Sequence, residues 1–491
     1  MYRKTITSII CLLLLCMLCL SSCGIITVNS KDPQNTTAST EVETHPDEET
    51  DPPETVESAM PPVNIPEPED WEIRFNEAST MLNNQINLSF EEKILLIIDS
   101  TGTFSDPLVQ NNIYSEAVYE RYSLLEEKYG MKVSVASAER ESVYDEYIKT
   151  VNSGNTYCDM LSVPIRDTAK FIQSGYIQNL RSLPFFKASD EYSIPSFDIS
   201  RAAYDDVWFS IGYATLSPDD LGCIYFNRTI AGKSDLDLYS IVENGEFTIE
   251  KYLEILTITG GSVVCREEIN LCLTSIELAN VSFFETGYGK EISLSSDVFT
   301  HTVSYVTDFL SVLNKSLVNI PEGKNSLEIF AEGNALFRLG TLAEIEEIAK
   351  QKLFFGVLPM PKADVESEYQ TPVSDMTAAL MITTNTAQTE MCSVTVNALN
   401  AVSYKWLLDS AGLHYVNYYV PDIGSSKMIR TIIENPVLDF SASARYLTSW
   451  YDVLIYEPMK NKLENPDTDI EKLYTAANLR SFKSELNKYY K

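Results

Sequence analysis

The sequence predicts an α/β fold in which open sheets are flanked by helices. Segments with strand-like and helix-like apolar spacing alternate along the chain, which is the pattern of a parallel sheet with crossover helices. The first strand-like run, Ile94 to Ile98, is continuously apolar, as expected of a strand buried on both faces. About 420 residues follow the N-terminal region, enough for two such sheets in two lobes.

The first half of this region predicts a strand–helix repeat. Gly130, Gly154 and Gly175 follow the three helix-like segments and are expected to end them. The predicted elements are, in order, a strand at 94–98, a helix at 114–129, a strand at 133–135, a helix at 143–151, a strand at 159–163 and a helix at 166–174. Ligands of such sheets bind beyond the carboxyl ends of the strands, here at 101–105 and 164–168.

A second α/β set follows. Gly333 is expected to form a turn between a helix end and a strand. The predicted elements are a strand at 222–226, helices at 248–256 and 298–310, a strand at 335–339, a short helix at 345–348 and a strand from 354 that ends in a Pro-broken loop by 362.

Residues 1–23 have the pattern of an export signal. Arg3 and Lys4 precede twelve apolar or Cys residues, a run too short to span a bilayer. The L-S-S-C sequence that ends at Cys23 resembles the bacterial lipobox, whose cysteine receives a diacylglyceryl thioether. The resemblance implies a lipoprotein signal peptide and a protein held by lipid on the outer face of the cytoplasmic membrane. An ordinary cleaved signal peptide is the alternative.

Residues 24–70 predict a disordered tether. They hold eight Pro, seven Thr and twelve Asp or Glu, with Lys31 as the single base. Such an acidic Pro/Thr-rich segment has too little apolar surface to offset its ordering entropy. A flexible chain of this length has an end-to-end distance of roughly 35–40 Å, enough to hold a domain clear of a membrane.

Charge and cysteine content narrow the class of protein. The formal net charge is −33, of which −24 falls on residues 71–491, so nucleic acid and anionic lipid are poor partners. Five cysteines remain after residue 23, and an odd number excludes a complete disulfide framework. Cys265 and Cys272 lack zinc-site spacing, and we interpret these thiols as buried and free. With only three His residues in the chain, a multi-histidine metal site or Ser-His-Asp triad is poorly supported.

Several separated segments together resemble one family, the extracellular solute-binding proteins (family 1, maltose-binding-protein-like) of bacterial ABC importers, in lipoprotein form. Their order and spacing, more than any one segment, make this resemblance specific. The matching segments are D-M-L-S-V at 159–163 ahead of F-I-Q-S-G-Y-I-Q-N-L at 171–180, G-C-I-Y-F-N-R at 222–228, E-F-T-I-E-K-Y-L from 246, F-A-E-G-N-A-L-F from 330, F-G-V-L-P-M-P-K from 355 and Y-Y-V-P-D-I-G-S-S-K-M-I at 418–429.

The resemblance implies a two-lobed, periplasmic-binding-protein-like fold (type II), each lobe an open sheet flanked by helices, joined by a hinge near 213–221. Residues 71–212 and about 368–420 would form lobe 1, and residues 213–367 and about 421–491 lobe 2. A monomer of this kind would close on a small solute, most simply a sugar or oligosaccharide, and deliver it to ABC importer permease subunits. No catalytic residue, cofactor or metal is implied.

The stretch I-I-D-S-T-G-T-F, residues 97–104, raises an enzymatic hypothesis. It resembles the D-K-T-G-T motif of P-type ATPases, in which the aspartate, here Asp99, is phosphorylated with the help of Mg²⁺. We find no second acidic segment of the required kind and no transport helices, so we do not expect this chemistry. Two interpretations stay open: Thr101 and Thr103 offer hydroxyls to a ligand, or the segment is an Asx-type turn whose hydroxyls cap the backbone.

Sugar sites combine aromatic faces with carboxylates and amides. The candidate ligand-binding residues near the predicted cleft loops are Thr101, Thr103, Phe104, Trp208, Tyr213, Arg338, Asp375 and Trp406. Maltose-type relatives carry a tryptophan just after the segment that matches Leu339-Gly340. Thr341 stands here instead, which speaks against maltodextrin as the solute.

Two further functions are compatible with the composition. A surface-anchored glycoside hydrolase would use two carboxylates, which are abundant here, although the order of elements argues against it. A solute sensor or adhesion protein without a transporter would share the binding fold.

Overall fold

The computed structural model describes residues 68–104, 113–259, 262–265, 282–420 and 422–490. The predicted signal peptide with Cys23 lies outside the described residues, as does the predicted tether up to residue 67. Helix α2 runs from Pro68 to Asn83, so the last three residues of the predicted tether are helical. In the described part of the chain, every helix is too short or too polar to cross a membrane.

The first sheet has the strand order β12-β3-β1-β2. Strands β1 (Ile94–Asp99), β2 (Lys132–Ser137) and β3 (Met160–Pro164) are parallel, and β12 (Ala378–Ile382) joins the β3 edge in antiparallel direction. Helices α3 (Ile113–Tyr129), α4 (Arg140–Asn152) and α5 (Thr168–Ser174) connect or follow the parallel strands. The predicted strand–helix repeat is confirmed, and Gly175 ends α5 with φ of 75°.

Strand β1 is less buried than its apolar run predicts. Leu95 and Ile97 are fully buried, but Leu96 and Ile98 are half-buried and Ile94 is 57% exposed. The expectation of burial on both faces is therefore wrong for the start of the strand. Ile94 begins β1 beside Lys132, the first residue of the sheet-edge strand β2, where little covers it.

The second sheet has the order β10-β6-β9-β7. Strand β6 (Gly222–Asn227) is antiparallel to both β9 (Phe337–Thr341) and β10 (Phe355–Leu358), and β7 (Val263–Cys265) is parallel to β9. The strand predicted at 335–339 starts two residues later, because the chain is still in the turn that follows Gly333, whose φ is 76°. Helices α9 (Ile249–Thr259) and α11 (Ser296–Lys315) extend further than predicted.

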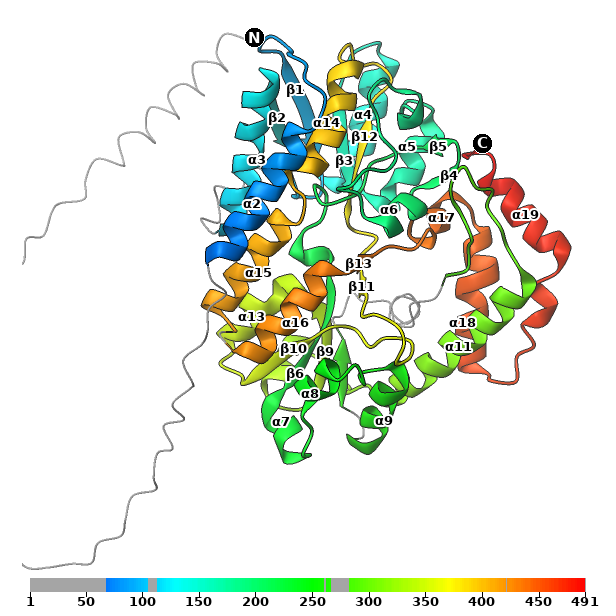
Figure 1. Cartoon of the computed structure of the whole chain (residues 1–491). Helices are drawn as coiled ribbons and strands as arrows, with labels where there is room; N and C mark the ends of the chain where they lie inside the picture. The colour runs from blue at the N-terminus through cyan, green and yellow to red at the C-terminus, as the bar shows by residue number, and fades with distance from the viewer. Residues whose placement is uncertain (1–67, 105–112, 260–261, 266–281, 421, 491) are drawn as a thin grey trace, which may run out of the picture. The chain divides into compact units, whose positions relative to one another are not determined.

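The chain crosses between the two sheets more than once. Helix α14 (Thr389–Val402) packs on α2 and α3, whereas α16 (Ile423–Glu434) packs on β10 of the second sheet, and α15 (Trp406–Tyr418) links them. Figure 1 shows β11 (Thr371–Pro372) and β13 (Pro436–Val437) between the two sheets.

The C-terminal segment is predicted to finish on the second lobe. In the structure it contacts helices beside both sheets. Helix α17 (Ser441–Leu447) packs against α5 and the preceding turn, while α18 (Glu457–Glu464) packs against α11. The remaining elements are α6 (Pro195–Ser200), β4 (Ala202–Tyr204), β5 (Asp206–Val207), α7 (Arg228–Lys233), α8 (Leu238–Glu243), β8 (Gly287–Tyr288), α12 (Ser326–Ala331), α13 (Ile345–Lys350), α19 (Ala476–Leu486), the 3₁₀ turns η2 (Ile165–Asp167), η3 (Leu180–Ser182), η4 (Pro218–Asp220), η5 (Leu342–Glu344) and η7 (Glu471–Leu473), and the π-helical η6 (Asp452–Tyr456).

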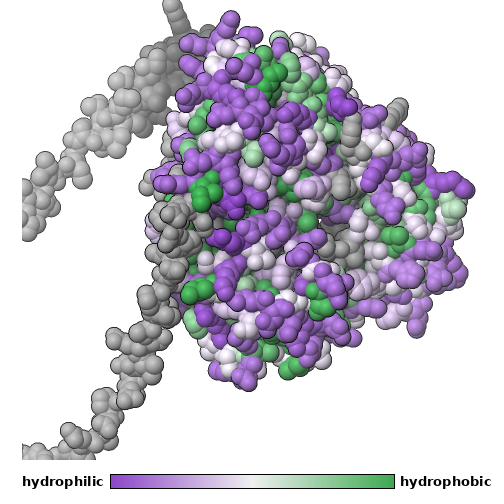
Figure 2. Space-filling model, in the orientation of Figure 1, coloured by the Kyte–Doolittle hydropathy of each residue, from purple (hydrophilic) through white to green (hydrophobic). Residues whose placement is uncertain are grey.

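Two hydrophobic clusters hold the described residues together. The larger joins β3, through Leu161 and Val163, with Leu339 and Val357 of the second sheet, so the two predicted lobes share one core. The smaller lies among α2, α3, α14 and the other face of the first sheet. Outside these clusters, the visible surface carries mostly hydrophilic side chains with small separated hydrophobic patches (Figure 2).

Candidate functional site

The turn after β1 is organised by Asp99. The side chain is 1% exposed, and its Oδ1 accepts hydrogen bonds from the backbone N–H and the hydroxyl of Thr101, at 2.9 and 2.7 Å. Its Oδ2 accepts the backbone N–H of Phe104 at 2.8 Å. Gly102 between them has φ of 81°, a conformation that favours glycine. This is an Asx-type turn, and both carboxylate oxygens of Asp99 serve the backbone that follows it.

Three neighbouring candidates, Thr101, Thr103 and Phe104, take part in the contacts of this turn. The Thr101 hydroxyl bonds Asp99 and lies 3.0 Å from the hydroxyl of Ser162 on β3, so it closes the turn. Phe104 is fully buried under the guanidinium of Arg121, which lies 5.0 Å from the ring centroid. We therefore assign Phe104 to the core and not to a ligand surface. Thr103 is half-buried, and its carbonyl accepts from Arg121 Nη2 at 3.2 Å.

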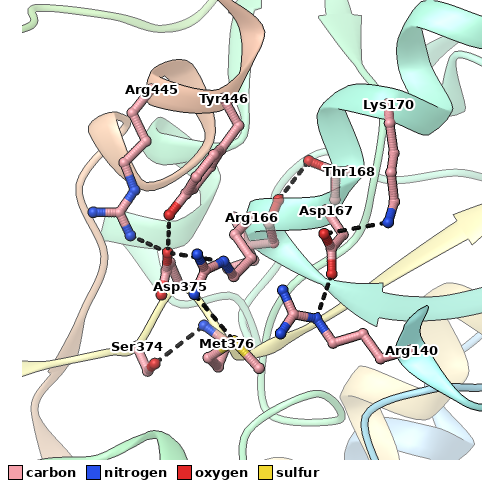
Figure 3. A network of polar contacts seen from close by, with 11 residues as sticks. Arg140, Arg166, Asp167, Thr168, Lys170, Ser374, Asp375, Met376, Arg445 and Tyr446 are labelled. Carbon is pink, nitrogen blue, oxygen red and sulfur yellow. Dashed lines mark hydrogen bonds and ion pairs between the residues drawn. The ribbon is translucent and has the colours of Figure 1, made fainter. Parts of the chain in front are cut away.

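Asp375, which precedes β12, lies at the carboxyl end of β3. Its backbone carbonyl accepts the N–H of Arg166 at 3.0 Å. Its carboxylate accepts from Arg445 and from the hydroxyl of Tyr446 at 2.6 Å, and lies 3.9 Å from Nε of Arg166. Figure 3 shows these side chains converging from η2, from α17 and from the segment before β12. Segments far apart in sequence thus meet on this carboxylate.

A second carboxylate lies beside the first. Asp167 accepts from Arg140 Nε at 2.6 Å and lies 3.3 Å from Lys170 Nζ. The hydrogen bond with Asp167 raises the pKa of Arg140, which therefore stays charged. We call the following set the arginine cluster: Arg140, Arg166, Asp167, Lys170, Asp375, Arg445 and Tyr446.

The carboxyl end of the second sheet approaches the same region through the crossing segment η4. The Thr341 hydroxyl, at the end of β9, donates to Asp219 at 3.1 Å. The carbonyl of the next residue, Asp220, accepts the N–H of Ser374 at 3.0 Å, directly before the arginine cluster. The carboxyl ends of β3 and β9, one strand from each sheet, are therefore linked through residues 217–221 and 373–377.

Asp220 is the buried member of this crossing. Its carboxylate accepts from the N–H and the hydroxyl of Ser217, at 2.7 and 2.8 Å, in a capping box. Burial is the largest influence on this carboxyl and raises its pKa to about 6.

The other predicted site residues take structural contacts. Arg338 is buried and paired with Glu344 in the second sheet's own interior. Tyr213 is 7% exposed, with its ring edge-on to Tyr404 at 5.3 Å between centroids. Trp208 donates its Nε1–H to the carbonyl of Tyr489 at 2.5 Å.

Trp406 is fully buried and lies edge-on to Phe75 at 5.1 Å. These contacts are those of a core residue. Of the eight predicted residues, the structure brings Asp375 into the arginine cluster and Thr101 and Thr103 to the neighbouring strand end.

The cluster's cations were not among the site residues predicted from the sequence. Arg166 lies within the loop at 164–168, which is predicted at a strand end, and its positive charge at that position is the signal that could have identified it. Arg445 and Tyr446 follow no motif, and only the packing of α17 against η2 brings them there.

The described residues hold no group of three or more His, Cys, Asp or Glu side chains suited to a metal ion. Cys158, Cys223, Cys265 and Cys392 are free, and burial raises the pKa of each thiol, which makes each a poor nucleophile. Cys272 lies outside the described residues. A cavity of about 310 Å³ lies instead near the amino ends of β7 and β9, lined by Ile230, Thr259 and Asn334 among others, away from the carboxyl ends described above.

No protein-family model and no curated protein matches the sequence. Among solved structures, the chain is similar to the GacH receptor of Streptomyces glaucescens, determined unliganded and with acarbose, at 12% identity over 82% of this chain and 100% of that one, with a TM-score of 0.47. It is similar to a family 1 extracellular solute-binding protein from Bifidobacterium longum subsp. infantis at 12% identity over 81% and 100%, with a TM-score of 0.49. It is also similar to the maltose-binding periplasmic protein of Listeria monocytogenes at 12% identity over 82% and 100%, with a TM-score of 0.45. The strand orders and the repeated crossings between the sheets assign this chain to the α/β class with two sheets, connected as in the type II fold.

Proposed function

We propose that the protein is an extracellular solute-binding protein that captures a small solute, most simply a sugar or oligosaccharide, for an ABC importer. The observation that carries this proposal is that the carboxyl ends of β3 and β9, one strand from each sheet, are linked through residues 217–221 and 373–377. Ligands of open α/β sheets bind beyond the carboxyl ends of the strands. A solute held between two such edges would contact both, and closure around it would shift the population of the protein toward the state that a permease recognises.

The N-terminal sequence supports the proposed location. A basic start, a short apolar run and L-S-S-C before Gly24 favour export and a lipid anchor at Cys23, on the outer face of the cytoplasmic membrane. The acidic segment that follows would give the body reach toward solutes outside the cell and toward permease subunits in the membrane.

The decisive experiment is a thermal-shift screen of the purified mature chain against sugars, amino acids and short peptides, with chromatography of each mixture after incubation. A ligand at a hundredfold its Kd stabilises the folded state by about 2.7 kcal/mol, which is readily visible as a shift in Tm. We expect one class of solute to raise Tm and to be recovered unchanged. Product that accumulates with time would favour the glycoside hydrolase, and the absence of a shift with every class would contradict solute capture.

Transport is separable from sensing. Once a ligand is known, a strain that lacks this chain should lose uptake of the radiolabelled solute and recover it when the chain is restored. Unchanged uptake would contradict the importer role and favour a sensor or adhesion protein.

A further inference from the structure

The arginine cluster carries more positive than negative charge. Arg140, Arg166, Lys170 and Arg445 face the two carboxylates of Asp167 and Asp375, in a chain whose formal net charge is −33. Arg140, Arg166 and Lys170 are each about a third exposed, at 33%, 38% and 35% of their side chains. Solvent, or a solute, therefore reaches three of the four cations.

Arg166 is the cation with the weakest internal pairing. The Asp375 carboxylate already accepts from Arg445 and Tyr446, and Arg166 reaches it only at 3.9 Å. Within the described residues, the other contacts of its guanidinium are Met376 Sδ at 3.7 Å and the Tyr446 ring, whose centroid lies at 5.4 Å. The Met376 contact uses one N–H of Nη1, and neither contact supplies the pair of oxygens that the planar fork of an arginine binds.

The position of the arginine cluster suits its excess of positive charge to ligand binding. Arg140 begins α4 directly after β2, and Arg166 lies in η2 directly after β3, so both stand at the carboxyl ends of parallel strands. Guanidinium groups bind carboxylates and phosphates in bidentate geometry, and an anion placed among several cations relieves their mutual repulsion. Ion pairing alone would need only one cation for each of the two carboxylates.

We propose that the arginine cluster recognises an anionic group, a carboxylate or phosphate, on the captured solute. This inference rests on the proposed function and narrows its ligand from sugars in general to acidic sugars or sugar phosphates. Asp219 lies in the crossing segment η4, is exposed and would repel such a group. The anionic end of the solute therefore binds at the first sheet and a neutral hydroxyl-bearing part faces Asp219.

The test compares matched ligands on the full mature chain by isothermal titration calorimetry. Oligogalacturonate is compared with galacto-oligosaccharide of equal length, and glucose 6-phosphate with glucose, at low and high NaCl. Two variants are compared with the unaltered chain: Arg166→Gln, and Arg480→Gln as a matched control on the exposed surface of α19.

We expect an acidic ligand to bind more tightly than its neutral partner, with affinity that falls as salt rises. Arg166→Gln should weaken this binding about tenfold or more, as expected for loss of hydrogen bonds to a charged group, while Arg480→Gln leaves it unchanged. Whether the galacturonate or the phosphate arm responds identifies the source of the anion. An unliganded Tm of Arg166→Gln equal to that of the unaltered chain would place the effect in binding and not in folding.

Other outcomes overturn the inference in distinguishable ways. A neutral sugar that binds as tightly as its acidic partner, or an acidic ligand whose affinity is unchanged by Arg166→Gln, would leave solute capture standing and remove the anionic specificity. Equal weakening by Arg480→Gln would show a general charge effect. The absence of binding by every arm, together with a negative screen of other solutes, would contradict both the inference and the proposed function.

Discussion

The hydroxyl of Tyr446 donates a hydrogen bond to Asp375 at 2.6 Å and thereby fixes α17 to the segment that precedes β12. Burial raises the pKa of Tyr446, so the phenol keeps its proton. Helix α17 is therefore fastened to the carboxyl end of β3 in the first sheet by a charge-assisted hydrogen bond.

Tyr446→Phe should lower the free energy of unfolding by about 1–3 kcal/mol, because it removes one hydrogen bond to a charged acceptor and keeps the ring. Urea denaturation followed by circular dichroism measures this loss. Tyr418→Phe is the matched control, since Tyr418 is 66% exposed. Equal midpoints for Tyr446→Phe and Tyr418→Phe would contradict the contact.

Asp99→Asn should destabilise the protein and leave no lost catalytic activity to detect. The asparagine oxygen can accept from Thr101, but its amide nitrogen cannot accept the N–H of Phe104 that Oδ2 now receives. We expect a loss of about 1–3 kcal/mol in the free energy of unfolding. Hydroxylamine-sensitive labelling of the unaltered chain by a phosphodonor, abolished in Asp99→Asn, would instead restore the phosphoryl-acceptor hypothesis.

Arg121→Met should be among the more destabilising single changes. The guanidinium is fully buried and donates to the carbonyls of Ala214 at 3.0 Å and Thr103 at 3.2 Å, and to the hydroxyl of Tyr122 at 3.1 Å. Methionine fills much of the volume but leaves these acceptors unpaired, which costs about 3 kcal/mol or more. Arg480→Met, at an exposed position, is the control. If Arg121→Met and Arg480→Met had similarly small effects on the free energy of unfolding in urea titrations, the stabilising role of the Arg121 hydrogen bonds would be disproved.

Because of Asp220, the free energy of unfolding should fall as pH rises from about 4 to about 6. Its pKa is raised from 3.8 to about 6, so within this window the folded state holds a proton that the unfolded state has released. The loss reaches about 3 kcal/mol and stays constant at higher pH. Unfolding free energies measured from pH 4 to 8 should therefore depend less on pH in Asp220→Asn, whereas Asp219→Asn follows the unaltered chain. Parallel curves for Asp220→Asn and the unaltered chain would contradict the raised pKa.

Cys23→Ala should release the protein from membranes or leave it unprocessed. Two acyl chains on one cysteine supply the anchoring that a single chain does not. Membrane fractionation with metabolic labelling by a fatty acid measures the effect, and Cys19→Ala within the apolar run of the signal is the control. Retention of Cys23→Ala at the membrane, with no lipid label on the unaltered chain, would contradict the lipobox assignment.

The periodic part of the fold was predictable from the sequence, because local patterns determine it. The spacing of apolar residues gave α3 and α4, and the glycine after α5 adopts the expected left-handed conformation. Strand β12 and helix α17 carry no comparable local signal of where they pack. Their positions depend on contacts with residues far away in sequence, which periodicity does not encode.

The candidate site was predictable in place more than in detail. Strand ends identified the loops that hold Asp99 and Arg166, because carboxyl ends are where parallel sheets bind ligands. Aromatic residues were poor guides: Phe104 and Trp406 fill the core, as large apolar rings usually do. Arg445 could not be assigned to the site from the sequence. A helix that packs over the end of a distant strand has no signature of that contact in its own sequence.

The antiparallel pairing of β12 with β3, Ala378 opposite Pro164, has a consequence for how the chain folds. Until β12 has been synthesised, β3 is the edge of its sheet, and all five of its residues are ones that the finished protein buries. An apolar, unpaired edge of this kind is a template for aggregation. Pairing between such distant segments is also a slow, non-local step. The first four-stranded sheet therefore starts before the second in sequence and is completed after it. A fragment that ends before β12 should aggregate where the whole chain stays in solution.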